Sequence, residues 1–414
     1  MKSKKGISGK LFSSLGNNNI NVRAIAQGAS ERNISIIIDE INAKKALNAL
    51  HESFFEKDLK DIHIFITGVG NVGGYLIQQI KNQKDFISEN LGLNLKVLGV
   101  SNSKKMLISK EEIDLKNWSK LLDNSKTKAD KDLFQKTIIE LNRRNSLFVD
   151  NTASDIIPLT YNDYLKNGVG IITCNKISNS GTLNVYKELR ELSMRHNARF
   201  FYETNVGAAL PVISTLKNLI NSGDKVLKIE AVLSGTLNYI FNNFQEENTF
   251  HDIVSNAVNL GYTEPDPKID LCGIDVCRKI LILARESGYN LEYEDVKKNH
   301  FLPDESINTT SNDEFILSLK NNKSHFNKIL NEAKEKNCRL KFVAKLDNGN
   351  ASVGLEAVSL DHPFYNLVGS DNITVFHTER YKDSPLVVKG AGAGGEFTAS
   401  GVFADIIKAS QENG

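Results

Sequence analysis

The feature that most constrains the fold of this 414-residue chain is a glycine-rich turn between a short apolar strand and a helix. Residues 62–67 are predicted to form the strand and residues 75–80 the helix. The turn itself reads Gly68, Val69, Gly70, Asn71, Val72, Gly73. In this G-x-G-x-x-G pattern the first glycine permits a tight turn, the second admits a pyrophosphate and the third lets helix and strand pack closely. The pattern therefore predicts dinucleotide binding at the helix N-terminus, the alternative being a purely structural turn.

The segments after this turn alternate between strand and helix. Further strands are expected at residues 95–100, 147–150, 169–173 and 200–203, and helices at 133–143 and 183–196. This alternation predicts an α/β fold, with a parallel sheet covered on both faces as in a Rossmann-type domain.

From Pro211 onward helices alternate with less regular strands, which predicts a second domain of α+β type. These strands are expected at residues 228–233, 340–346 and 353–358. Near the end, a strand at 386–389 runs into a glycine-rich stretch and a helix at 398–407, which we expect to return to the nucleotide domain.

The first 55 residues predict a separate small module of helix, strand, strand and helix, at residues 7–15, 19–25, 34–38 and 43–54. This order is half of a ferredoxin-like unit whose first strand would precede residue 1. We therefore expect four segments: a partial regulatory module (1–58), a nucleotide-binding domain (59–204), a catalytic and dimerisation domain (205–388) and a C-terminal return (389–414).

Composition limits the classes of partner. The net charge of +1 does not suggest nucleic-acid binding, and no stretch approaches the ~20 apolar residues that span a membrane. The four cysteines have no metal-ligand spacing and are few for the length. They favour a reducing, cytoplasmic location.

Two lysines follow the second predicted strand of the nucleotide domain. NAD-binding proteins usually place an acidic residue there to bind the ribose 2′-hydroxyl, and none is present. Lys104 and Lys105 would instead meet a 2′-phosphate, which favours NADP(H) while NAD(H) stays possible. A solvated turn is the alternative.

Polar residues also follow the next two strands, at the sheet edge where ligands bind. Thr152 and Ser154 could bond a ribose or nicotinamide, or could simply cap the next helix. Lys176 would lie in the same crevice, or be an ordinary loop lysine.

A block of ionisable residues surrounds an apolar helix between Glu264 and Lys279. Apolar residues fall on most faces of the helix from Ile274, so it should be largely buried. Asp275 and Lys279 are four residues apart and lie on one face. The block predicts either an ordinary helical ion pair or an active site in which carboxylates and a lysine meet a polar substrate.

The segment from Glu203 to Pro211 is apolar and contains glycine. Its backbone carbonyls and the Glu203 carboxylate could coordinate a hard cation, because such ions prefer oxygen ligands. On composition alone, a hinge between domains is the simpler interpretation.

Taken in order, these motifs resemble homoserine dehydrogenase, in the form that makes up the C-terminal half of bifunctional aspartokinase/homoserine dehydrogenases. The resemblance runs from about residue 60 to residue 412 and is carried by residues 68–73, 175–176, 203–211, 233–240, 261–267, 270–279 and 390–394. It implies reversible NAD(P)H-dependent reduction of L-aspartate 4-semialdehyde to L-homoserine, a step towards threonine, methionine and isoleucine.

The resemblance also implies roles for single residues. Lys279 would be the general acid, Lys176 a second catalytic lysine, and Asp275 would orient Lys279. Relatives often carry another lysine where this chain has Ile177, so Lys176 is the lysine expected at the site. The other implied residues are Glu264 and Asp270 for the substrate amino group, Tyr262, Ser234, Gly235 and Thr236 as pocket lining, Gly392 and Gly394 for the cofactor, and Glu203 with the carbonyls of Val206, Ala208 and Leu210 for a sodium-like ion.

Residues 6–55 resemble the end of the ACT regulatory region that precedes the dehydrogenase in such fusions. This likeness implies a threonine effector, with Gln27 where an effector-contacting glutamine is expected, and a chain that is a fragment of a longer protein. The resemblance to homoserine dehydrogenase further implies a homodimer or higher oligomer, paired through strands after residue 340.

Two other functions fit parts of the pattern. One is a dehydrogenase of a different amino-acid semialdehyde or hydroxy acid, since the acidic block indicates an amino-bearing substrate without fixing its length. The other is a threonine-sensing module that keeps a nucleotide fold as scaffold. Lys176, Asp275 and Lys279 argue against a pure sensor, which needs no proton donor.

Overall fold

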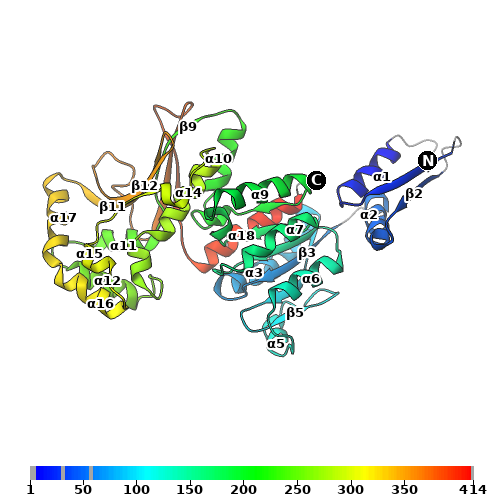
Figure 1. Ribbon diagram of the computed structural model, residues 1–414, viewed down its shortest axis with the longest axis horizontal. Coiled ribbons are helices and arrows are strands. Elements are labelled where there is room, and N and C mark those ends of the chain that lie inside the picture. Colours follow the sequence, from blue (N-terminus) through cyan, green and yellow to red (C-terminus); the bar gives the residue numbers. More distant parts are fainter. Residues whose placement is uncertain (1–5, 29–32, 56–58, 412–414) are drawn as a thin grey trace. The chain divides into compact units, whose positions relative to one another are not determined.

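The computed structural model describes residues 6–28, 33–55 and 59–411, with helices and strands labelled in Figure 1. The chain divides into two compact units. The first comprises the chain up to Ile177, Asn184–Tyr202 and the end of the chain from Val402, and the second comprises Ser178–Leu183 and Glu203–Gly401. Among the described residues, no helix is both long and apolar enough to cross a bilayer.

The first unit begins with the predicted helix–strand–strand–helix module. It consists of α1 (Ile7–Gly16), β1 (Val22–Gln27), β2 (Ile34–Ile38) and α2 (Ala43–Phe55). The two strands pair antiparallel, and Leu15, Ile20 and Ala46 form a small core beneath them. The first strand starts three residues later than predicted, because Asn19 adopts a left-handed conformation (φ 56°) in the turn that ends α1.

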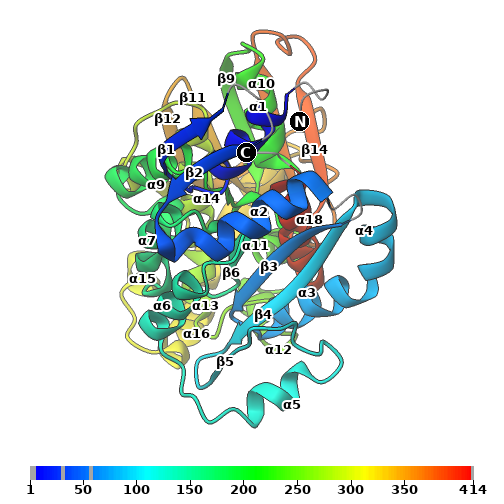
Figure 2. The ribbon, with the colours of Figure 1, turned by 90° about the vertical axis from the view of Figure 1, so that its right-hand side faces the viewer.

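The sheet that follows has the order β5-β4-β3-β6-β7-β8. All neighbours pair parallel except β4 and β5, and β3 and β4 run side by side in Figure 2. Its central strands are buried, as covering helices require. The strands are β3 (Lys60–Thr67), β4 (Leu93–Ser101), β5 (Met106–Ile108), β6 (Ser146–Asp150), β7 (Gly170–Thr173) and β8 (Phe200–Phe201).

The helices of this unit are α3 (Asn71–Asn82), α4 (Lys84–Leu91), α5 (Trp118–Asp123), α6 (Lys131–Leu141), α7 (Tyr161–Lys166) and α9 (Leu183–Arg195). The last helix, α18 (Gly395–Gln411), belongs to this unit from Val402 onward. The Lys60 ammonium donates to the Ser410 carbonyl at 2.8 Å, which ties the end of α18 to the start of β3.

The strand predicted at residues 200–203 is wrong in its second half. It stops at Phe201, and Glu203–Asn205 form a 3₁₀ turn. The Glu203 carboxylate accepts backbone N–H groups of Ile213 and Ser214 at 2.7 and 2.8 Å. These bonds cap the next helix, α10 (Val212–Asn221).

The second unit is built on a sheet of order β10-β12-β11-β9-β13-β14, antiparallel except for the β10–β12 pair. Strand β13 was not predicted, because asparagine and threonine interrupt its apolar pattern. The strands are β9 (Val226–Val232), β10 (Lys297–Asn299), β11 (Arg339–Asp347), β12 (Asn350–Val358), β13 (Asp371–Thr378) and β14 (Leu386–Ala391).

Helices pack beside this sheet, and α11, α12, α15, α16 and α17 gather together in Figure 1. Helix α14 lies against β11 and β12 and is buried on most of its faces, as its sequence predicts. The helices are α11 (Gly235–Asn243), α12 (Phe250–Asn259), α13 (Pro267–Leu271), α14 (Ile274–Glu286), α15 (Asp304–Ile307), α16 (Asn312–Asn321) and α17 (Lys323–Glu335).

A fully buried lysine fixes α11 to the sheet. The Lys341 ammonium, on β11, donates to the side-chain oxygens of Asn238 (3.1 Å) and Asn242 and to the Leu367 carbonyl (2.7 Å). Burial lowers the pKa of Lys341 to about 8, so the group is still mostly charged at neutral pH. The three acceptors compensate for its burial.

We predict that Lys341→Met destabilises the protein at pH 7 by about 3 kcal/mol, because three buried acceptors lose their donor. Urea unfolding followed by circular dichroism measures this change. Lys336→Met, at an exposed position just after α17, is the control and should have little effect. Equal stability of the two variants would contradict the anchoring role of Lys341.

Candidate functional site

The space around the Cβ position differs among the three glycines of the glycine-rich turn. Gly68 adopts φ +87°, and a Cβ there would lie 2.8 Å from the Asn151 backbone. A Cβ on Gly73 would lie 2.2 Å from the Gly68 carbonyl oxygen, so α3 approaches the turn as closely as glycine allows. Gly70, in contrast, has no atom within 4 Å of its Cβ position. This open space beside the N-terminus of α3 fits a pyrophosphate group.

A cavity of about 340 Å³ opens at the carboxyl ends of these strands. Thr67 and Gly68 line it together with Thr152 and Ser154, two of the residues predicted to contact a cofactor. The Ser154 hydroxyl accepts the Ile156 N–H at 3.3 Å, so this serine also serves the local turn. Residues 101–103, which sequence reasoning did not single out, line the same cavity.

The two lysines after β4 lie in a turn that the Asn102 side chain holds. Its oxygen accepts the backbone N–H groups of Lys104 and Lys105 at 2.8 and 2.7 Å. The Lys105 ammonium donates to the Asp123 carbonyl, whereas Lys104 is exposed. Lys104 is therefore the better placed of the two for a phosphate on the ribose.

A buried carboxylate organises the loops that follow β6 and β7. Asp150 accepts the Tyr161 hydroxyl at 2.7 Å, the Thr152 N–H at 2.8 Å and the Asn175 amide at 3.2 Å. Burial raises the pKa of Asp150 to about 6. The Asn175 amide also donates to the Ser154 carbonyl at 2.7 Å, so the residue before Lys176 is fixed at the sheet edge.

In the second unit the acidic block surrounds a buried ammonium. Lys279, on α14, lies 2.8 Å from the Asp275 carboxylate, one turn earlier, and donates to the Leu233 carbonyl at 2.6 Å. The lysine is buried and the Asp275 side chain is about half exposed. The pair therefore presents a fixed cation beside a solvent-accessible carboxylate.

Two further carboxylates stand near this pair. Asp270, on α13, accepts the Glu264 N–H at 2.8 Å, which closes the loop before the helix. Burial raises the pKa of Asp270 to about 6, with smaller contributions from the negative charges of Glu264 and Asp275 and an opposing one from Lys279. Helix α13 packs against α14, and the Glu264 N–H bonds to Asp270, so the four ionisable groups lie on adjoining segments.

The turn that begins α11 lies next to the same cluster. The Ser234 hydroxyl caps the helix by accepting the Leu237 N–H at 3.1 Å. The Thr236 hydroxyl donates to the Tyr262 carbonyl, and the Tyr262 ring, about half exposed, packs edge-on against Tyr239. A Cβ on Gly235 would lie 3.1 Å from the Ser370 carbonyl oxygen, so this position is tightly packed.

The Leu233 carbonyl links several elements of this unit, a role that sequence reasoning missed. Besides Lys279 it accepts the Asn372 amide, on β13, at 3.3 Å. That amide also donates to the Gly392 carbonyl at 3.3 Å, and a Cβ on Gly392 would overlap the Asn372 side chain. Gly392 is thus required by packing, while Gly394 adopts φ +115° and directly precedes α18.

The predicted ion-binding segment has an unusual backbone. Gly207 adopts φ +82° and Ala208, although not a glycine, adopts φ +53°. Both oxygens of Glu203 accept backbone N–H groups, as described above. No group of three or more His, Cys, Asp or Glu side chains within the described part of the chain is arranged to hold a metal.

Three family models match the chain in succession. They are an ACT domain over residues 1–54, the NAD-binding domain of homoserine dehydrogenase over residues 68–203, and homoserine dehydrogenase over residues 211–407. The homoserine dehydrogenase of Schizosaccharomyces pombe is 37% identical over 358 residues, covering 84% of this chain and 95% of that protein.

The chain belongs to the homoserine dehydrogenase family. It is an oxidoreductase with a domain for a nicotinamide cofactor, preceded by an ACT domain. The predicted fold class, a Rossmann-type domain with an α+β domain and an ACT module, is confirmed.

Bifunctional relatives match almost the whole chain. Bifunctional aspartokinase/homoserine dehydrogenase 2 of Zea mays, a chloroplastic protein, is 43% identical over 411 residues, covering 99% of this chain and 45% of that protein. The Haemophilus influenzae bifunctional enzyme is 38% identical and covers 99% and 50% respectively. The chain therefore spans about half the length of these relatives.

Solved structures agree on the fold. A hyperthermophilic archaeal homoserine dehydrogenase in complex with NADPH superposes with a TM-score of 0.66 at 26% identity, covering 84% of this chain and 98% of that chain. A Candida auris protein of unknown function gives a TM-score of 0.79 at 33% identity, covering 86% and 99%.

We predict that Gly70→Val weakens NADPH binding roughly 100-fold, about 3 kcal/mol of lost phosphate contact, while the protein keeps its melting temperature. The open space around the Gly70 Cβ position accommodates the side chain only when no phosphate is there. Gly73→Ala is the contrasting variant, since its Cβ clashes within the fold itself. Fluorescence titration and thermal unfolding of both variants test this. Undiminished NADPH affinity in Gly70→Val would contradict the assignment.

Proposed function

We propose that the chain reduces L-aspartate 4-semialdehyde to L-homoserine with NADPH, and catalyses the reverse reaction. The observation that carries this proposal is the buried Lys279 ammonium, held by Asp275 and the Leu233 carbonyl within a cluster of carboxylates. A fixed cation suits a carbonyl reduction, and carboxylates suit a substrate that bears an amino group.

Lys279 acts as the general acid. A nicotinamide cofactor, when bound, would supply the hydride that reduces the aldehyde carbon, and negative charge would develop on the aldehyde oxygen. The Lys279 ammonium stabilises that charge and donates a proton to the oxygen, which yields the hydroxyl of homoserine. Asp275 holds the Nζ atom in position through the 2.8 Å contact, and Lys176 is the second catalytic lysine.

The carboxylates of Glu264 and Asp270 bind the substrate amino group, and Tyr262 with the Ser234-Gly235-Thr236 turn lines the pocket. The support is the cluster geometry: the Glu264 N–H fixes Asp270, and the Thr236 hydroxyl fixes the Tyr262 backbone. Other amino-acid semialdehydes carry the same functional groups and differ from this substrate in chain length. The activity assay with semialdehydes of different length distinguishes them.

The cofactor is NADPH in preference to NADH. Among the described residues that line the cavity, Asp130, which caps α6, is the only acidic one, and the exposed Lys104 lies in the turn after β4. The residues of the glycine-rich turn fit a dinucleotide cofactor, because the open space at Gly70 admits its pyrophosphate. Gly392 and Gly394 are proposed as further cofactor contacts.

The carbonyls of Val206, Ala208 and Leu210 and the Glu203 carboxylate would hold a sodium-like ion. The left-handed backbone at Gly207 and Ala208 supports this proposal, because strain at a non-glycine residue is retained where the carbonyl direction matters. An all-oxygen ligand set suits a hard cation.

The chain corresponds to the dehydrogenase half of a bifunctional aspartokinase/homoserine dehydrogenase, as the names of its relatives suggest. Threonine is the proposed effector, through Gln27 at the end of β1. We propose a homodimer paired through the second-unit sheet, whose edge strand β14 is half exposed. A cytoplasmic location fits the four free cysteines.

The purified chain should oxidise NADPH, followed at 340 nm, when L-aspartate 4-semialdehyde is added. Lys279→Ala should lower turnover by about 10²–10⁴-fold, because the proton donor is lost, with NADPH affinity unchanged, because the glycine-rich turn is intact. Lys328→Ala, an exposed lysine on α17, is the control and should be fully active.

Repeating the assay with NADH measures the cofactor preference. An active Lys279→Ala enzyme would refute the role of Lys279. A folded protein that binds NADPH but is silent with this substrate, and active with a shorter or longer amino-acid semialdehyde, would refute the substrate assignment.

The raised pKa of Asp270 predicts a pH dependence. With a pKa of about 6 the carboxylate is ionised at neutral pH and becomes neutral as the pH falls below 6, losing its attraction for the substrate amino group. The kcat/KM for the semialdehyde should therefore fall about tenfold per pH unit below 6. Asp270→Asn should be weaker at neutral pH and lack this dependence, whereas the exposed Asp313→Asn should retain it. An unchanged profile in Asp270→Asn would contradict the assignment.

A further inference from the structure

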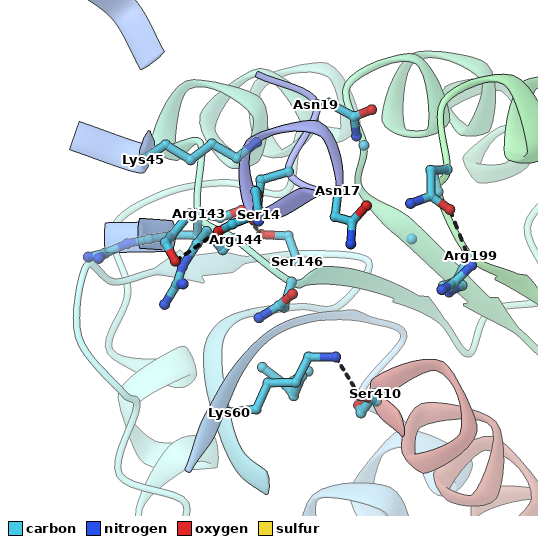
Figure 3. Close-up of a pocket in the computed structure, with 18 of the residues that line it drawn as sticks. Ser14, Asn17, Asn19, Lys45, Lys60, Arg143, Arg144, Ser146, Arg199 and Ser410 are labelled. Atoms are coloured by element: carbon cyan, nitrogen blue, oxygen red, sulfur yellow. Dashed lines mark hydrogen bonds between the residues drawn. The ribbon is translucent and has the colours of Figure 1, made fainter. Parts of the chain in front are cut away.

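A second cavity of the first unit lies at the opposite ends of the strands from the glycine-rich turn. It has a volume of about 380 Å³ and opens where β3, β6 and β7 begin, at Ile62, Ser146 and Gly170. Helices α1 and α2 of the ACT module line it from one side (Figure 3). Because β3 runs from Lys60 to Thr67, this cavity is separated from Gly68 by the length of that strand.

Every charged side chain among the described residues that line this cavity is a cation. Three lysines and three arginines are among its lining residues, and none of the described lining residues is Asp or Glu. The cations come from five separate parts of the chain: Lys10 on α1, Lys45 on α2, Lys60 at the start of β3, Arg143 and Arg144 before β6, and Arg199 before β8. Most of the other lining side chains are serine or asparagine.

Three of these cations make contacts with neutral groups. Lys60 donates to the Ser410 carbonyl at 2.8 Å and Arg143 to the Lys110 carbonyl at 2.8 Å. Lys10 lies 5.4 Å from the centre of the Phe54 ring. The neighbouring acid, Asp61, is paired with Lys96 at 2.5 Å and so is engaged elsewhere. These three contacts orient Lys10, Lys60 and Arg143 and do not themselves neutralise the charge of the cation involved.

The concentration of charge has an energetic cost. Burial lowers the pKa of Lys45, and burial together with the positive charge of Arg199 lowers the pKa of Lys60. Like charges gathered in a partly desolvated cavity repel each other, and a bound anion would remove both penalties.

The lining also indicates which anion. Guanidinium groups match phosphate oxygens in pairs, and serine and asparagine side chains supply neutral donors around them. The lining includes no aromatic side chain among the described residues, so nothing there would stack on a nucleotide base. The volume is that of a small-molecule site.

We propose that this cavity binds a small, multiply phosphorylated anion between the ACT module and the amino-terminal edge of the nucleotide-binding sheet. Such a ligand would contact Lys45 on one side and Lys60 and Arg144 on the other (Figure 3). The site is separate from the cofactor site, and its occupancy would couple the ACT module to the sheet that carries the cofactor turn.

Isothermal titration calorimetry with inorganic tripolyphosphate tests the proposal on the full chain, with saturating NADP⁺ present so that the glycine-rich turn is already occupied. We expect one site. Lys45→Gln should weaken binding about tenfold and Lys45→Gln with Arg144→Gln about 100-fold, one charge-assisted contact per substitution. Lys44→Gln is the matched control, since Lys44 neighbours Lys45 on α2 but does not line the cavity.

Lys45→Arg should restore the affinity, and near-UV circular dichroism checks that each variant is folded. Three results would overturn the proposal: no binding of tripolyphosphate, an equal loss in Lys44→Gln, or citrate binding as tightly as tripolyphosphate. The second would show non-specific attraction, and the third would show that phosphate is not what the cavity recognises.

Discussion

The bond from the Lys279 ammonium to the Leu233 carbonyl is the contact on which the second unit depends. One carbonyl oxygen accepts both this ammonium, from α14, and the Asn372 amide, from β13. Because Asn372 also contacts Gly392, the same point joins the end of β9, the start of α11 and the return after β14. The buried charge is thereby held at a junction that packing has already made rigid, which is what a proton donor requires.

The first unit also has a buried ionisable group that holds neighbouring segments in place, but its charge is negative. A buried carboxylate, Asp150, accepts bonds from Thr152 and Asn175, on the loops after β6 and β7, and from Tyr161 at the start of α7. The loops bearing Thr152, Ser154 and Lys176 are fixed as a result. In each unit the hydrogen bonds to one buried ionisable group offset the free-energy cost of burying it. The same bonds fix the segments that approach a ligand. The fold and the site are therefore built from the same contacts.

Much of this could be predicted from the sequence, and the remainder could not for physical reasons. The glycine-rich turn and the buried helix α14 are local patterns, so spacing alone located them and paired Asp275 with Lys279. The Leu233 carbonyl and Asn372 were not predicted. Every residue carries a backbone carbonyl, so the side-chain pattern does not mark this one, and its partner Asn372 is 139 residues away. Likewise the basic cavity was not predicted, because its cations lie on five segments of the chain that no regular spacing in the sequence links.

The central claim is that Asp275 and Lys279 act as one unit at the reacting centre, and a double-mutant cycle on turnover tests it most directly. Semialdehyde reduction would be measured for Asp275→Ala, Lys279→Ala and the double variant, each at saturating NADPH. If Asp275 works only by placing the ammonium, the double variant should be no slower than Lys279→Ala alone. Losses that multiply, as for two independent groups, would contradict the account.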